Sequence, residues 1–92
     1  MKNNKYKYLE KILKALANKR RLMILSFLKK EKEATVGTIA QEIKLSFRST
    51  SRHLIVLFSA EIVEKEQRGT EAYYFLANKD TSRVVKEVLS RV

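Results

Sequence analysis

The 92-residue sequence has no cysteine and no proline, and its only glycines are Gly37 and Gly69. Without cysteine the chain cannot form a disulfide, a thiolate metal site or a cysteine redox switch. Because proline and glycine are scarce while 45% of the residues are apolar, we expect an ordered, mainly helical chain. The length fits one small domain, residues 1–92, with a single core that a partner subunit would help to stabilise.

Long apolar runs are also missing. The longest run, Leu54 to Phe58, is far shorter than the roughly 20 residues that a membrane span needs. No apolar signal-peptide core follows the basic N-terminus. We therefore expect a soluble, cytoplasmic protein that has no membrane partner.

Groups suited to catalysis are few. His53 is the single histidine, and there is no glycine-rich phosphate loop. No acid pair or Ser/His/Asp set has a spacing that suggests a catalytic site. We expect no enzymatic activity, no catalytic residue and no cofactor.

Positive charge is what the sequence has in excess. There are 20 Lys and Arg against 10 Asp and Glu, a formal net charge of +10. Residues 1–32 carry eleven basic and two acidic residues, so +9 of the net charge lies in the first third of the chain. Such an excess favours binding to a polyanion such as nucleic acid, although an anionic membrane surface or simple solubility stays open at this point.

Apolar side chains recur at helical spacing along most of the chain. Asn18, Thr35, Ser46 and Asp80 are good N-cap residues, and each stands directly before one of the periodic segments. The pattern predicts helices over about residues 5–17, 19–30 and 36–43, a fourth that begins at residue 47, and a last helix after residue 80.

The third and fourth predicted helices are joined by only two or three residues, which is typical of a helix-turn-helix unit. After them, the segments "IVEKEQ" and "EAYYFL" favour β-structure on either side of Gly69, which can adopt the positive φ of a hairpin turn. The predicted fold is mainly α with a small β-hairpin wing, a winged helix-turn-helix of about five helices and two to three short strands.

The fourth predicted helix, "SFRSTSRHLIVLF" at residues 46–58, has a polar, basic first half and an apolar second half. With Leu54 pointing inward, Arg48 and Arg52 point away from the core. Ile55 and Val56 extend the apolar surface around the outside, so we expect neighbouring elements to cover the second half. A DNA recognition helix has this arrangement, but so does a buried helix with a solvated start.

Three stretches occur in the order and spacing of the ArsR/SmtB family of winged helix-turn-helix repressors. They are "LKALANKRRLMILSFL" (13–28), "VGTIAQEIKLSFRSTSRHLIVL" (36–57) and "EIVEKEQRGTEAYYFL" (61–76). The chain resembles that family over most of residues 10–78. The resemblance implies a sequence-specific, homodimeric transcriptional repressor that binds double-stranded DNA. The alternatives are a non-specific basic nucleic-acid or chromatin protein and a winged-helix protein-interaction module.

The resemblance also implies roles for individual residues. The expected DNA contacts are Phe47, Arg48, Ser49, Thr50, Ser51, Arg52, His53, Gln67, Arg68 and Thr70. Among them Arg48, Ser49 and Arg52 are the strongest candidates for base or phosphate contacts, whereas the angle of Phe47 favours packing onto the core. The expected dimer interface comprises Tyr8, Leu9, Ile12, Val84, Val85, Val88 and Leu89, although these apolar stripes could instead pack within one monomer.

The sequence departs from the family at its metal sites. The family's Cys-x-Cys pair aligns with Thr35 and Gly37, neither of which is a thiolate ligand, and residues 79–92 contain no histidine. We therefore expect no metal at either familiar place, and the effector is unknown.

Lys44 and Glu61 stand where the family often has glycine, at the ends of the third and fourth helices. A non-glycine residue at positive φ costs on the order of 1 kcal/mol. We therefore expect these two helix ends to be built differently from those of the family.

Overall fold

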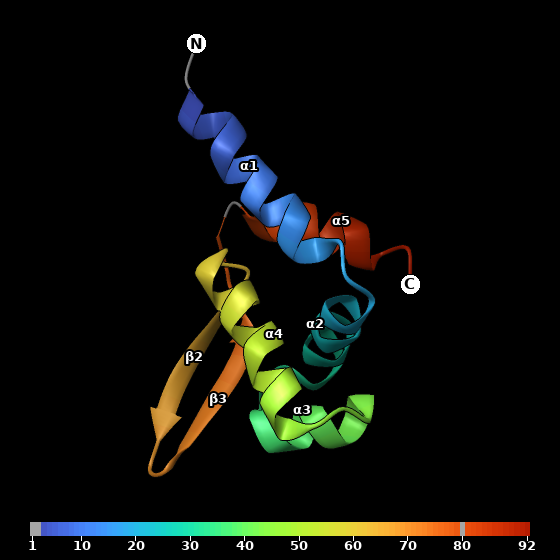
Figure 1. Ribbon diagram of the computed structural model, residues 1–92, viewed down its shortest axis with the longest axis vertical. Coiled ribbons are helices and arrows are strands. Elements are labelled where there is room, and N and C mark those ends of the chain that lie inside the picture. The colour runs from blue at the N-terminus through green and yellow to red at the C-terminus, as the bar shows by residue number, and fades with distance from the viewer. Residues whose placement is uncertain (1–2, 80) are drawn as a thin grey trace.

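The computed structural model describes residues 3–79 and 81–92 (Figure 1), excluding the side chains of residues 3, 81 and 82. Within these residues, five helices and three strands follow the predicted order and confirm the winged helix-turn-helix fold. The elements are α1 (Asn3–Leu16), α2 (Lys19–Glu31), β1 (Ala34–Thr35), α3 (Val36–Ile43), α4 (Phe47–Ser59), β2 (Val63–Arg68), β3 (Glu71–Leu76) and α5 (Thr81–Leu89).

Side-chain caps begin three of the helices where they were predicted. The side-chain oxygen of Asn18 accepts a hydrogen bond from the Arg21 N–H at 3.1 Å and begins α2. Thr35 and Ser46 act in the same way at the starts of α3 and α4. Each cap satisfies a backbone N–H that has no partner within its helix. The predicted cap Asp80 lies outside the described residues.

The prediction that Lys44 and Glu61 build their helix ends differently is wrong. Lys44 is left-handed, with φ 56° and ψ 52°, and Glu61 has φ 60°. The next N–H in each case reaches back five residues, from Leu45 to the Ala40 carbonyl and from Ile62 to the Leu57 carbonyl, both at 3.0 Å. These hydrogen bonds close the helix ends as glycine would, because they bind carbonyls of the last helical turn.

The three strands form one antiparallel sheet in the order β1-β3-β2. β2 and β3 are a hairpin in which Arg68 pairs with Glu71, and Gly69 takes φ 63° in the turn between them. β1 adds a short edge by pairing Ala34 with Tyr74. The turn of this hairpin therefore projects from the body of the protein as the predicted wing (Figure 1).

One core joins all five helices to the sheet. Leu25, Ile39, Leu54 and Leu57 have no exposed surface. The core also takes in Ile12, Val85 and Leu89, each at most 3% exposed. The prediction that these last three residues meet a second subunit is therefore wrong, because the protomer's own helices already cover them. Val84 and Val88 are half-buried against the same core.

The arrangement of the elements gives the molecule two distinct ends. α3, the start of α4 and the hairpin turn lie toward one end, and the start of α1 lies at the other (Figure 1). None of the helices in residues 3–79 and 81–92 is long and apolar enough to cross a membrane.

The second half of α4 is less covered than predicted. Ile55 is 61% exposed, Phe58 44% and Val56 39%. The expectation that neighbouring elements cover Ile55 and Val56 is wrong, because the core reaches only the face of α4 that carries Leu54 and Leu57.

The left-handed conformation of Lys44 makes a stability prediction. Lys44→Gly should raise the free energy of unfolding by about 0.5–1 kcal/mol, because glycine removes the Cβ strain at positive φ but gains some freedom in the unfolded chain. Urea unfolding at fixed protein concentration measures the change. The control Glu42→Gly, inside α3, should lower stability by about 1 kcal/mol. A loss of stability in both variants would contradict this account of the cap.

Candidate nucleic-acid interface

The first half of α4 presents two arginines to solvent. Arg48 and Arg52 are both exposed and lie four residues apart, so they share one side of the helix. Ser49 and Ser51 are half-buried beside them. Arginines at this spacing near a helix N-terminus can reach guanine edges or phosphate oxygens.

Phe47 lies in a different place from the one predicted. Its side chain is 63% exposed, so the expectation that it packs onto the core is wrong. Leu45, just before the N-cap, packs against the core instead. Phe47 is therefore a large apolar group at the solvent-facing start of α4, next to Arg48, where it can contact a base or its methyl group.

Thr50 of α4 was predicted to contact DNA but is buried. Its side chain has no exposed surface, and its hydroxyl donates to the Ser46 carbonyl at 2.8 Å. The threonine supports the start of the helix from inside. Its predicted role as a DNA contact is wrong, because a ligand cannot reach it.

His53 is held by an arginine from α2. Nη1 of Arg21 lies 3.3 Å from Nδ1 of His53, and since an arginine can only donate, Nδ1 accepts and the proton of the neutral ring sits on Nε2. Burial, followed by the positive charges of Arg21 and Arg20, lowers the pKa of His53 below its ordinary value. The lowered pKa favours the neutral imidazole, whose Nε2–H is a donor that can serve a phosphate.

Arg21 is a structural residue that sequence reasoning missed. Its Nε donates to the Ala15 carbonyl at 2.6 Å and its Nη2 to the Lys14 carbonyl at 3.2 Å, both at the end of α1. Arg20 likewise donates to the carbonyl of Ile43, at the end of α3. These bonds satisfy carbonyls at helix ends. The sequence offers no signal for them, because the partners lie on other helices.

The wing carries its predicted residues Gln67, Arg68 and Thr70 on the surface. Gln67 is turned toward its own hairpin, since its side-chain nitrogen donates to the Gly69 carbonyl at 3.1 Å. Thr70 is exposed within the turn. The cation beside the turn is the guanidinium of Arg68, at the end of β2.

The guanidinium of Arg68 is clamped by two carboxylates. It donates to both oxygens of Glu33, at 2.5 and 2.8 Å, and to Glu66 at 2.7 Å. It also lies 4.5 Å from the centre of the Tyr73 ring. The hydrogen bond from Arg68 lowers the pKa of the Glu33 carboxyl, and the two carboxylates raise that of Arg68. These contacts occupy four of its five N–H groups, so a phosphate that accepts two hydrogen bonds from this arginine would replace a carboxylate.

The lysines of α1 begin away from this surface. α1 carries Lys5, Lys7, Lys11 and Lys14, and it starts at the end of the molecule opposite the hairpin turn and α3 (Figure 1).

Among the described residues, no group of three or more His, Asp or Glu side chains comes together as a metal site.

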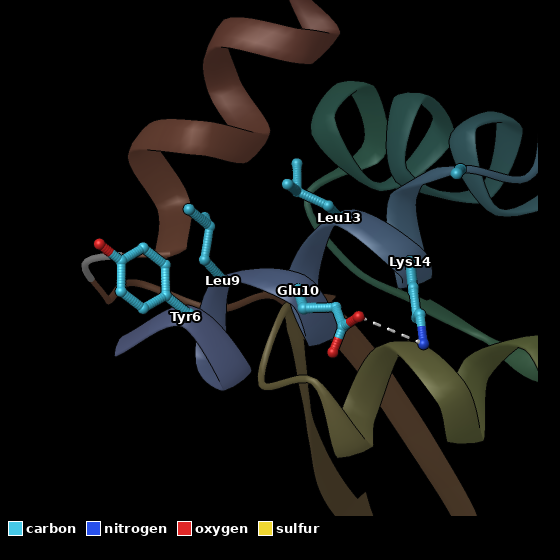
Figure 2. Close-up of a pocket in the computed structure, with 6 residues that line it drawn as sticks. Tyr6, Leu9, Glu10, Leu13 and Lys14 are labelled. Carbon is cyan, nitrogen blue, oxygen red and sulfur yellow. Dashed lines mark ion pairs between the residues drawn. The ribbon is translucent and has the colours of Figure 1, made fainter. Parts of the chain in front are cut away.

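α1 also carries an exposed apolar face. Tyr6, Leu9 and Leu13 are 57%, 41% and 50% exposed, and they border an open depression of about 380 Å³. They project from one side of α1, whereas Glu10 and Lys14 form an ion pair on another side (Figure 2). Leu9 was predicted to be part of an interface, whereas Tyr6 and Leu13 were missed. Tyr8, which was also predicted, is 46% exposed.

Comparison with known proteins identifies relatives along most of the chain. The model of the family described as bacterial regulatory protein, arsR family, matches residues 18–65. The HTH-type transcriptional regulator Rv0324 of Mycobacterium tuberculosis is 39% identical over 77% of this chain, and this chain spans only 31% of that relative's length. The uncharacterized HTH-type transcriptional regulator MJ1325 of Methanocaldococcus jannaschii is 32% identical, over 91% of this chain and 94% of the relative.

A solved structure agrees with the fold. The homodimeric winged helix-turn-helix DNA-binding domain of Mycobacterium bovis superposes with a TM-score of 0.85 at 32% identity, over 99% of this chain and 86% of that one. Relatives of similar identity include the arsenical resistance operon repressor of Bacillus subtilis and the transcriptional activator HlyU of Vibrio cholerae.

The clamp on Arg68 predicts the effect of one substitution. Glu33→Gln should strengthen binding to any duplex DNA and steepen its salt dependence by up to about 0.9 in log K per log salt, because the guanidinium, then paired with Glu66 alone, can neutralise one more phosphate. Anisotropy titrations over a salt series measure both changes.

The control for Glu33→Gln is Glu71→Gln, which removes the same charge from the hairpin without touching a hydrogen bond to Arg68. Equal gains in the two variants would show that charge alone is responsible. The clamp would also be contradicted if the gain from Glu33→Gln persisted in an Arg68→Ala background.

Proposed function

This chain belongs to the ArsR family of bacterial regulatory proteins and is a winged helix-turn-helix DNA-binding regulator, and we propose that it acts as a homodimeric repressor that reads an inverted-repeat DNA site. The observation that carries the proposal is the exposed pair Arg48 and Arg52 on the first half of α4, at the same end of the molecule as the wing. In this proposal α4 enters the major groove, and the wing meets the neighbouring backbone.

The proposed reading residues follow from exposure. Arg48 and Arg52 read base edges, Phe47 makes an apolar contact, and Ser49, Ser51 and His53 bond to the sugar-phosphate backbone. Gln67, Arg68 and Thr70 are the proposed wing contacts. Phosphate contacts set the position of the helix, whereas the two arginines and Phe47 supply sequence preference.

The proposed dimer uses α1. Tyr6, Leu9 and Leu13 form an apolar face without a covering element in the described residues. A twofold contact between two such faces would bury it and bring together two copies of α4. The homodimeric state of the similar Mycobacterium bovis domain supports this assembly. We propose repression in particular because a dimer seated over a promoter would exclude polymerase, and the similar Bacillus subtilis protein is an operon repressor.

Non-specific coating of nucleic acid is the main alternative, and it rests on the +9 charge of residues 1–32. The lysines of α1 argue against it, because α1 begins at the end of the molecule away from α3 and the wing. A protein that bound through those lysines would leave Arg48 and Arg52 without a role.

Selection of bound sequences from a random duplex library at about 150 mM salt tests the proposal directly. We expect enrichment of an inverted repeat with half-sites about one helical turn apart, which binds at least about a thousandfold more tightly than a scrambled duplex. Tight, salt-sensitive binding to all sequences without enrichment would overturn it and favour the coating function.

Arg52→Ala tests the role of α4 on the selected site. The variant should lose about 1–3 kcal/mol of specific binding and relax the preference at one position of each half-site. Lys5→Ala, on α1, should have a small effect that is the same for all sequences. The reading role fails if both variants weaken specific and scrambled DNA equally in anisotropy titrations.

Leu13→Glu tests the proposed dimer face. A carboxylate on the apolar face should raise the dimer dissociation constant at least about tenfold. Analytical ultracentrifugation measures it, and circular dichroism checks that the helices remain. Lys7→Glu adds the same group elsewhere on α1 and should change the constant little. Dissociation that is unchanged by Leu13→Glu would place the interface on another surface.

A further inference from the structure

The outer side of α4 borders a groove that the DNA-binding function does not use. The groove has a volume of about 360 Å³ and runs between α4, α1 and the start of α2. Ile55 and Val56 of α4, with Ala60 just after its end, supply apolar lining. Ile55 is 61% exposed, which is a large exposed surface for a branched apolar side chain on a helix. The groove lies on the second half of α4, away from Arg48 and Arg52.

Three cations stand along the opposite side of this groove. Lys11 and Lys14 come from α1 and Arg21 from α2, and no acidic residue lines the groove. Lys14 is 3.6 Å from Glu10, but both side chains are more than 60% exposed, so this pair holds the ammonium only weakly. Lys11 has no ion pair within the described part of the chain.

Arg21 fixes one end of the groove and still has donors to offer. Its contacts with the carbonyls of Lys14 and Ala15 and with the His53 ring use three of its five N–H groups. The contacts hold the guanidinium in place without adding a negative charge. A positioned guanidinium beside two mobile ammonium groups is suited to a carboxylate or sulfonate.

We propose that this groove binds a small amphipathic anion. The acidic group lies among Lys11, Lys14 and Arg21, and the hydrocarbon or aromatic body lies on Ile55 and Val56. The volume is within the range of small-molecule sites. Neither the apolar lining nor the cations alone would select such a molecule, since the first would accept any apolar compound and the second any anion.

A second copy of this chain is a poorer occupant. A twofold contact centred on the groove would bring the three cations of one protomer against the same three of its partner, without acids in the lining to offset them. The apolar face of Tyr6, Leu9 and Leu13 offers a second copy a contact without that repulsion. The binding proposal is independent of the DNA site and stands or falls without it.

The test is a titration of the ¹⁵N-labelled full chain with sodium decanoate, below its micelle concentration, followed by amide chemical shifts. Decanoate should give saturable shifts at the lining residues. Decylammonium, which has the same tail and the opposite charge, should bind at least about fivefold more weakly. Equal binding of the two compounds would overturn the proposal, because the cations would then have no part in it.

Matched substitutions locate the site. Ile55→Ser and Lys11→Gln should each weaken decanoate binding about threefold to tenfold. The controls Phe58→Ser and Lys29→Gln remove an exposed apolar group from α4 and a charge from α2, both outside the groove, and should leave binding unchanged. All four side chains are exposed, so the variants should fold normally.

Three results would overturn the proposal. The first is an absence of saturable shifts. The second is an equal loss of binding in the groove variants and their controls, which would indicate non-specific adsorption. The third is lining amides that change with protein dilution but not with decanoate, which would mean that a second copy covers the groove.

Discussion

The guanidinium of Arg21 connects the three helices on which the DNA-binding end depends. The backbone of Arg21 is held in place because its N–H donates to Asn18, the N-cap of α2. Its guanidinium joins the carbonyl end of α1 to His53 on α4. Carbonyls at a helix end carry partial negative charge, so a cation suits that position. The orientation of α4 relative to α1 therefore depends on one side chain as well as on the core. An anion bound in the proposed groove would use the N–H groups of that same side chain that these contacts leave free.

Charge and contact surfaces are arranged separately in this molecule. α1 holds a row of lysines at one end, whereas the hairpin at the other end carries three acids, Glu64, Glu66 and Glu71, against Lys65 and Arg68. A count of basic residues along the chain thus says little about which surface meets DNA. The exposed arginines of α4 are few, but their backbone positions are fixed by a capped helix whose other side is buried in the core.

Much of the fold could be predicted from local signals. The caps at Asn18, Thr35 and Ser46 and the periodicity between them fixed the helices, because both depend on residues within one turn. Whether a neighbouring element covers a given side chain could not be predicted in this way. A helical wheel gives the direction of a side chain but not whether a neighbouring element covers it, so Phe47 was expected to pack on the core and Ile55 to be covered. Contacts between distant segments were also out of reach, such as that between Glu33 and Arg68, which are 35 residues apart.

The clamp on Arg68 has a consequence for how the protein searches a genome. Because Arg68 is already paired with Glu33 and Glu66, it adds little long-range electrostatic attraction to DNA. The nearby negative charges cancel its field. Its contribution arises only when phosphates stand close enough to replace the carboxylates. If the wing meets the backbone as proposed, it would bind DNA weakly while the protein slides along non-specific sequence. It would bind strongly only where α4 occupies its specific site. The clamp would thereby shorten the residence time of the protein at non-specific sequences and leave its residence time at the specific site long.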